Sequence, residues 1–443
     1  MNAYYYVDAK GRLRFDDEYV GPIDLPKDTT DCSYLFFQCT IKSGCYLRNF
    51  DTSDVTEMSH MFNFATLPEG FTLGDNFDTS KVVSMKKMFK YCTMPSSFSL
   101  GDKFNTESVA DMSGMFAMCK MSKDFSLGKL FDTSNVKYME DMFNKCDFSK
   151  GFTLGSKFCT RSAISMAAMF KGTKLPANFS LGQCFYTFKV IDMSEMFASC
   201  KMNKDFALSS SFLTHNVLTM SGMFNNCKMS KGFSLSDAEF YTRDVQNMSQ
   251  MFYGCKLPKG FSLGDHFDTT NVMDMSEMFA GCTMPDDFTL GDKFCTISVE
   301  LMANMFAKCK MSKALTLANG YFITCNVLIM AGMFRETVLP ENFSLGQFFY
   351  TDKCSDFHGM FCRASLPPKF CLGDHFYTEQ SNLLNAMFED AEFRGSFCIG
   401  NHFYANGKEP FKGAKMSEDV WLINCGEKEN GKIHLRTNRE VLL

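Results

Sequence analysis

The stretch FDTTNVMDMSEMFAGCTMPDDFTLGDK, residues 267–293, is one copy of a unit that recurs along most of the chain. Its most regular part is a Phe-x-Thr motif, and successive motifs are 27 residues apart, or 28 at two places. They begin at Phe50, Phe77, Phe104, Phe131, Phe158, Phe185, Phe212, Phe240, Phe267, Phe294, Phe322, Phe349 and Phe376, with a degraded copy at Phe403. A constant period of this size predicts a solenoid, in which each unit buries its apolar face by stacking on its neighbours.

Two segments of the unit suggest secondary structure. M-x-x-M-F-x-x-C has apolar residues at i, i+3, i+4 and i+7, which predicts one face of a short helix. The F-x-L segment alternates apolar and polar residues, which predicts a short strand, and the following glycine permits a turn. The expected fold class is therefore an α/β repeat solenoid of about 14 coils of 27–28 residues, each with a short strand and a short helix.

The two ends differ from the repeats and predict terminal caps, because an uncovered end coil would expose its core. Residues 1–30 should form an N-terminal cap, with a hairpin that turns at residues 9–11. The repeats should occupy residues 31–414. Residues 415–443, which hold the only tryptophan, Trp421, should form a C-terminal cap of strand, turn and strand.

The composition bounds the function. The 443 residues include 49 Phe, 34 Met and 20 Cys, and the formal net charge is −5 with 21% charged residues. Such a chain should fold and lacks the basic excess expected of a nucleic-acid binder. It has no 18-residue apolar stretch, which predicts no membrane span, and no visible secretory signal, which predicts a cytoplasmic location. A surface or secreted location would require a longer native chain or another export route.

The methionine and cysteine columns could suggest a metal site, yet their pattern favours core packing. The second methionine recurs at Met61, Met88, Met115, Met142, Met169, Met196, Met223, Met251, Met278, Met305, Met333, Met360 and Met387. The cysteine column holds Cys92, Cys119, Cys146, Cys200, Cys227, Cys255, Cys282 and Cys309, but Ala65, Thr173, Thr337, Ala364 and Ala391 elsewhere. Alanine cannot bind a metal, so this column requires small size, and we expect neither a metal nor any other cofactor.

The threonine of Phe-x-Thr allows two interpretations, an ice-binding ladder or a hydroxyl that satisfies backbone groups. A flat ice-binding face would need exposed Thr-x-Thr pairs, whereas this single column lies between apolar Phe and Val positions. We therefore favour the backbone role. No sequence motif of a hydrolase, metalloprotease or nucleotide-binding enzyme occurs, which predicts a protein that is not an enzyme.

The position inside Phe-x-Thr does vary from coil to coil, and in a repeat protein such variation is where partner recognition can reside. It is acidic or Asn early in the chain, is tyrosine at Tyr186 and Tyr241, and becomes tyrosine in consecutive coils at Tyr350, Tyr377 and Tyr404, with His375 and His402 close by in sequence. If exposed, these residues would form a Tyr/His stripe suited to binding a protein or a glycan. An aromatic ladder that only stabilises stacking is the alternative.

The repeat sequence also resembles a known family. Phe-Asp-Thr-Ser-Asn-Val (131–136) and Asp-Met-Ser-Gly-Met-Phe (111–116), with a cysteine three residues after the last Phe, resemble the BspA-like leucine-rich-repeat proteins. The match is to the branch with FDTSNVTDMSxMFxxC repeats, common in mycoplasmas and gut bacteria. The resemblance implies a leucine-rich-repeat-like solenoid and a bacterial, non-enzymatic scaffold for adhesion or protein recognition. A structural spacer or assembly component, for example of a phage or secreted particle, is the alternative function.

Overall fold

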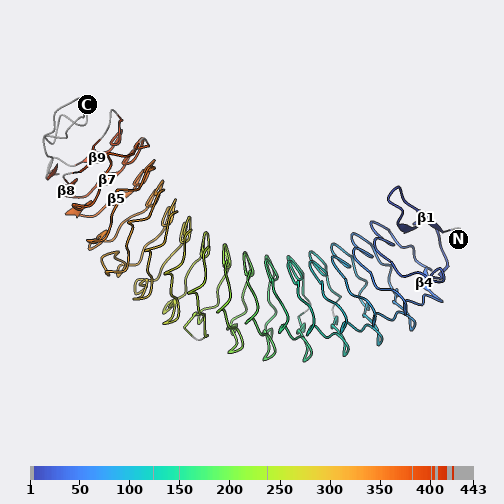
Figure 1. The fold of residues 1–443 in the computed structure, drawn as a ribbon. Coiled ribbons are helices and arrows are strands. Elements are labelled where there is room, and N and C mark those ends of the chain that lie inside the picture. The colour runs from blue at the N-terminus through green and yellow to red at the C-terminus, as the bar shows by residue number, and fades with distance from the viewer. Residues whose placement is uncertain are drawn as a thin grey trace. The chain divides into compact units, whose positions relative to one another are not determined.

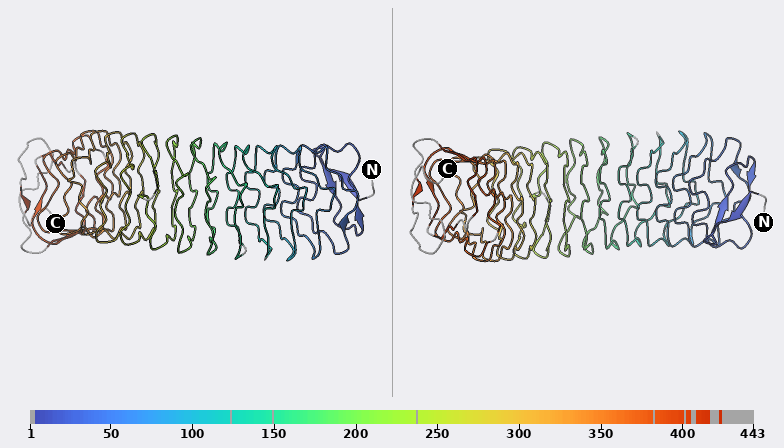
Figure 2. Two further views of the ribbon diagram at one scale, coloured as in Figure 1. Left: turned by 90° about the horizontal axis from the view of Figure 1, so that it is seen from below. Right: turned by 90° about the horizontal axis from the view of Figure 1, so that it is seen from above.

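The computed structural model describes residues 4–122, 124–148, 150–236, 238–381, 383–400, 402–404, 408–416 and 422–423. The chain divides into two compact units, Met1–Asn216 (unit 1) and Val217–Leu443 (unit 2). Within each unit the chain forms successive coils that lie side by side (Figures 1 and 2). Each unit is therefore a repetitive stack, as the 27-residue period predicts.

Regular strands are few and short, and most lie at the chain ends. They are β1 (Tyr5–Val7), β2 (Leu13–Phe15), β3 (Pro22–Ile23), β4 (Tyr46–Leu47), β5 (Ser365–Leu366), β6 (Phe370–Cys371), β7 (Glu392–Phe393), β8 (Phe397–Cys398), β9 (Lys415–Met416) and β10 (Leu422–Ile423). β1 and β2 pair antiparallel, β3 pairs with β4 in parallel, and two parallel three-stranded sheets have the orders β5-β7-β9 and β6-β8-β10.

The predicted α/β fold class is wrong, and with it the leucine-rich-repeat-like architecture. No α-helix occurs among the described residues, and the M-x-x-M-F-x-x-C segment is a series of turns in every coil where it is described. The F-x-L segment does point its Phe and Leu inward, as Phe71 and Leu73 show, but most copies are not paired as strands.

The coil from Met58 to Ala65 shows why the helix prediction failed. The N–H groups of Met61 and Ala65 donate to the carbonyl three residues earlier, whereas those of Met58 and Phe62 donate to the neighbouring coil. His60, between them, has a positive φ of 61°. Consecutive β-turns also place residues i, i+3, i+4 and i+7 on one side, so the apolar spacing is the same as in a helix. The hydrogen bonds, however, join the coils.

One-residue parallel bridges connect equivalent positions of successive coils. One such column in unit 1 runs through Asp31, Glu57, Ser84, Asp111, Tyr138, Ser165 and Asp192, and one in unit 2 through Thr219, Asn247, Asp274, Leu301, Ile329, Asp356 and Leu383. Because equivalent residues are paired, each column of the sequence becomes a straight row across its unit, with neighbours about 4.8 Å apart. A residue's column therefore decides which side chains it meets.

The core consists of stacked identical side chains. In unit 1 the phenylalanine after the second methionine stacks nearly parallel on its counterpart, as in Phe89 against Phe62 and Phe116, with centroids 5.4 and 5.7 Å apart. Unit 2 repeats the arrangement at Phe361 against Phe334 and Phe388. The second methionines are fully buried beside these rings, which confirms their predicted packing role.

The cysteine column is buried too, and its exchange with threonine has a structural basis. The Cys282 thiol donates to the carbonyl of Phe252 in the preceding coil, at 2.8 Å. The Thr173 hydroxyl makes the equivalent bond to Phe143, also at 2.8 Å. The column thus accepts a small residue with a donor as well as alanine, which confirms its predicted role as core filler.

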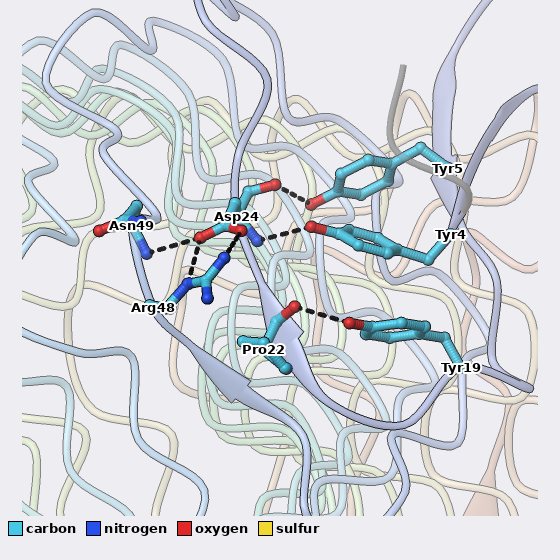
Figure 3. A network of polar contacts seen from close by, with 7 residues as sticks. All are labelled: Tyr4, Tyr5, Tyr19, Pro22, Asp24, Arg48 and Asn49. Atoms are coloured by element: carbon cyan, nitrogen blue, oxygen red, sulfur yellow. Dashed lines mark hydrogen bonds and ion pairs between the residues drawn. The ribbon is translucent and has the colours of Figure 1, made fainter.

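The predicted N-terminal hairpin is present as β1 and β2. Its strands join through a tight turn at Asp8, and a polar network fixes this region to the first coils (Figure 3). The Tyr5 hydroxyl donates to the Asp24 carbonyl at 3.1 Å, the Asp24 N–H donates to the Tyr4 hydroxyl at 3.0 Å, and Arg48 pairs with the Asp24 carboxylate. Trp421 and most of the predicted C-terminal cap lie outside the described residues.

Candidate functional site

The variable position inside Phe-x-Thr has a constant backbone environment. The threonine hydroxyl of one coil donates to the carbonyl of the variable residue in the next coil, at 2.6–2.9 Å. These threonines are almost fully buried. This confirms the backbone role and excludes an ice-binding ladder of exposed threonines. The variable side chain can therefore change while its backbone stays in place.

Acidic residues and Asn at the variable position have a local structural role. The side-chain oxygens of Asp51, Asp78, Asn105, Asp132 and Asp268 accept a hydrogen bond from the N–H two residues later, at 2.8–3.0 Å. Such Asx turns stabilise the start of the following segment. A tyrosine at this position cannot make this bond, so each tyrosine replaces a local stabilising contact by an aromatic ring.

The predicted Tyr/His stripe is formed in part. His375 is exposed, and Tyr350, Tyr377 and His402 are half-buried. Tyr350 packs against His375 of the next coil with centroids 4.7 Å apart, and Tyr377 packs against His402 at 4.4 Å. We call these four residues the C-terminal Tyr/His surface.

The fifth residue of the prediction lies elsewhere. Tyr404 is 1% exposed and belongs to the core. Its N–H and carbonyl both bond to the Thr378 hydroxyl, at 2.6 and 2.9 Å. Tyr404 therefore packs in the core, and its ring is not accessible to a partner.

Sequence reasoning missed a second aromatic region, near the N-terminus. Two rows of rings lie on the turns that flank the core phenylalanine. In the first row, the Arg12 guanidinium lies 4.0 Å above the Tyr34 ring, and the opposite face of Tyr34 stacks on His60 at 4.4 Å with an angle of 8°. Lys87 occupies the same column one coil further on. Cations therefore stand at both ends of a stacked aromatic pair.

The second row is parallel to the first. Phe64 stacks on Tyr91 with centroids 4.4 Å apart, and Phe37 meets Phe64 edge-on at 6.3 Å. Arg14 lies 5.3 Å above the Phe37 ring, and Lys90 lies 5.7 Å from that of Tyr91. We call the two rows together the N-terminal aromatic surface: Tyr34, Phe37, His60, Phe64 and Tyr91 with Arg12, Arg14, Lys87 and Lys90.

The surroundings of His60 report the electrostatic character of this surface. Partial burial lowers the pKa of His60 to about 4, and the positive charges of Lys87, Lys86, Lys90 and Arg12 add to the effect. The neutral ring is consistent with its contact to Asn63, whose amide nitrogen lies 2.7 Å from His60 Nδ1. The surface is therefore locally positive although the whole chain carries a formal charge of −5.

The signal for this surface was present in the sequence. The turn position of Tyr34 becomes His60 and then Lys87 in the next two coils, and that of Gln38 becomes Phe64 and then Tyr91, while the core columns stay constant. The helix prediction did not reveal the relation, because a helix keeps its backbone hydrogen bonds within one coil, whereas here they join equivalent residues of successive coils. In the stacked turns they form straight rows.

The described residues offer little for metal or thiol chemistry. They contain no group of three or more His, Cys, Asp or Glu side chains that could hold a metal ion. Burial raises the pKa of the Cys119, Cys255 and Cys309 thiols to about 12, so these remain protonated at neutral pH. In the described part of the chain, no helix is long and apolar enough to cross a membrane.

The stacked coils, the straight side-chain columns and the variable surface positions define a repeat protein. A family model described as "Mycoplasma protein of unknown function, DUF285" matches residues 30–150, 74–181, 147–261, 233–337, 260–370 and 292–396. Together these matches cover most of the chain, which therefore belongs to the DUF285 family. No curated protein and no solved structure matches the chain.

Proposed function

We propose that the protein is a non-enzymatic scaffold that binds a protein or a glycan, and that the C-terminal Tyr/His surface takes part in binding. The observation that carries this proposal is the change from Asx-turn residues to tyrosine at a position whose backbone does not change. An Asx hydrogen bond of this kind contributes about 0.5–1.5 kcal/mol. Tyr350 and Tyr377 forgo it in consecutive coils and present rings to the surface instead.

The pairing with histidine supports the same proposal. Tyr350 and Tyr377 each pack on the histidine of the next coil, so ring and imidazole edges alternate across three coils. Tyrosine and histidine combine apolar area with hydrogen-bonding groups, which suits recognition of polar partners. The resemblance of the repeats to the BspA-like proteins favours adhesion as the setting.

A direct test compares the full chain with the double variant Tyr350→Ala/Tyr377→Ala. Both proteins are used to recover partners from the native host and to probe a glycan array. Tyr404 is left in place, because its removal would leave a cavity in the core. The control is Tyr138→Ala/Tyr253→Ala, which removes two exposed tyrosines from other columns.

We expect the variant to lose at least one partner that the control retains, with unchanged circular dichroism. Equal recovery by both variants would remove the C-terminal Tyr/His surface as a binding site. Recovery of no partner by the full chain would favour the alternative of a structural spacer or assembly component.

A further inference from the structure

The N-terminal aromatic surface of unit 1 has a chemistry of its own, independent of the C-terminal Tyr/His surface. Its rings are close-packed on one another, so their faces are largely covered. Arg12 and His60 cover the two faces of Tyr34, and Phe64 covers one face of Tyr91. Nevertheless Phe64 is 47% and Tyr91 40% exposed. Stacking therefore removes one face of each of these two rings from solvent, while the edges stay accessible.

Ring edges and cations attract the same kind of ligand. The quadrupole of an aromatic ring makes its edge partly positive, so a carboxylate can approach it in the ring plane. Lys90 lies over the Tyr91 ring and Lys87 occupies the row of His60, and among the ion pairs of the described residues neither lysine is paired with a carboxylate. The Lys87 stem lies over Gly114, where a Cβ would be 3.0 Å from Lys87 Cγ. Because Gly114 has no side chain, there is room for the Lys87 stem at this point of the surface.

Neighbouring acidic groups limit the positive region. Asp8 pairs with Arg12 at 2.7 Å and with Arg14 at 3.5 Å, so these guanidiniums are partly neutralised. Lys86 lies 3.9 Å from Asp111, where a shallow hollow of about 400 Å³ begins that also includes Glu140 and Asp141. Lys87 also lines this hollow without forming an ion pair there, so the least balanced charge of the surface is that of Lys90, which lies over the Tyr91 ring.

We propose that the N-terminal aromatic surface binds an acidic peptide segment of a partner protein, with carboxylates at Lys87 and Lys90 and aliphatic side chains on Phe64 and Tyr91. Nucleic-acid bases and sugar rings both bind aromatic side chains through ring faces. Here Tyr34 stacks on His60, Phe64 stacks on Tyr91, and cations lie over Tyr34 and Tyr91, so fewer faces are open to such ligands. Carboxylates and aliphatic side chains need only edges and cations. Four adjacent chain segments at about 4.8 Å spacing provide room for an extended peptide of about five residues.

The test uses fluorescence polarisation with the full chain and a labelled peptide that repeats Asp-Phe-Glu-Leu. The comparison probes are a peptide that repeats Lys-Phe-Lys-Leu, an oligothymidylate and a sialylated oligosaccharide. The variant Lys87→Glu/Lys90→Glu reverses the two charges. Its control, Lys256→Glu/Lys259→Glu, makes the same change in net charge at exposed lysines of unit 2.

We expect the acidic peptide to bind, more weakly as salt rises, and the Lys87→Glu/Lys90→Glu variant to lose about tenfold or more in affinity. The control should retain its affinity. A second readout is the pKa of His60 by NMR, assigned with His60→Gln. Bound carboxylates would offset the field of Lys87 and Lys90 and raise this pKa from about 4.

Several results would overturn the proposal: no binding of the acidic peptide, equal loss in both charge variants, or tighter binding of the oligothymidylate or the oligosaccharide. The variant Phe64→Ser keeps all charges and tests the apolar part separately. Loss of peptide binding in that variant supports the proposal, and unchanged binding contradicts it. Tyr350→Ala/Tyr377→Ala should bind the peptide normally, so failure here and failure of the C-terminal site can be distinguished.

Discussion

The N-terminal aromatic surface and the C-terminal Tyr/His surface use rings in different ways. In the N-terminal surface, rings of adjacent coils stack on each other and on cations, as Tyr34 does with His60 and Arg12. In the C-terminal surface, tyrosines do not stack on tyrosines, and Tyr377 contacts His402 of the next coil instead. The columns explain the difference, because one set of rings occupies turn positions and the other occupies the variable position of Phe-x-Thr, whose carbonyl accepts from the threonine hydroxyl of the preceding coil.

The comparison teaches how a monotonous repeat can carry distinct chemistry. Both surfaces lie on a core of the same kind, made of Phe and Met rows. In both, hydrogen bonds between coils fix the backbone. Only the side chains of outward columns differ. Variation in these outward columns has little effect on stability, because surface substitutions usually change the free energy of unfolding by less than about 0.5 kcal/mol.

The largest expected effect concerns this shared core. Phe89→Ala in unit 1 and Phe361→Ala in unit 2 should each lower the free energy of unfolding by about 3–5 kcal/mol, since each ring is buried between two others. Urea unfolding followed by circular dichroism measures this loss. Phe64→Ala, which removes a half-exposed ring, should lower the free energy of unfolding by clearly less. Equal costs at all three positions would refute the common-core explanation.

The next effect distinguishes the N-terminal surface by its pH dependence. Because the pKa of His60 is lowered to about 4 in the folded state, the unfolded chain takes up a proton first as pH falls. The free energy of unfolding should therefore decrease from about pH 6.5 to pH 4. Below about pH 4, His60 should cause no further loss. The part of this loss due to His60 should be about 1–3 kcal/mol, allowing for partial exposure of the ring.

The measurement is urea unfolding at several pH values for the native chain and for His60→Gln. Carboxylates also titrate in the lower part of this window, so the prediction concerns the difference between the two proteins. That difference should grow as pH falls in favour of the variant. Parallel stability curves over the whole range would contradict the lowered pKa.

A smaller effect tests how the C-terminal surface is held. The Thr351 hydroxyl donates to the Tyr377 carbonyl at 2.8 Å and accepts from the Tyr377 N–H at 2.6 Å. Thr351→Val keeps the shape and removes both bonds, which should lower the free energy of unfolding by about 1–2 kcal/mol. Amide hydrogen exchange at Tyr377 should accelerate. In Thr79→Val, the matched control in unit 1, exchange at Tyr377 should not change.

Much of the core could be predicted from the sequence, and the backbone could not. The 27-residue period, the inward columns and the filler role of Met278 and Cys282 follow from repetition alone. The turns did not, because a spacing of i, i+3, i+4 and i+7 is common to a helix and to consecutive β-turns. The deciding fact, that the Met58 N–H bonds to the next coil, is non-local and leaves no trace in a single unit.

The two candidate surfaces also differ in how far the sequence predicts them. The change at Tyr350 and Tyr377 was visible because it occurs in a column that the sequence defines directly. The burial of Tyr404 was not, since it depends on the end of the stack. The rows around His60 and Phe64 were missed because they depend on how the turns of successive coils stack. The predicted helix gave no information on that stacking.

The smallest effect concerns the column in which cysteine and threonine alternate, and it tests whether the core is as uniform as the comparison of the two surfaces assumes. Cys282→Thr should keep the donor to the Phe252 carbonyl, as Thr173 and Thr337 do in their own coils at 2.8 and 2.6 Å. The free energy of unfolding should change by less than about 1 kcal/mol. Cys282→Val has a similar volume but no donor, so the Phe252 carbonyl would keep only its bond from the Cys255 N–H, which should lower the free energy of unfolding by about 0.5–1.5 kcal/mol. Urea unfolding of both variants gives the comparison. If valine were tolerated as well as threonine, the column would select size alone, and the natural threonines would have no hydrogen-bonding role.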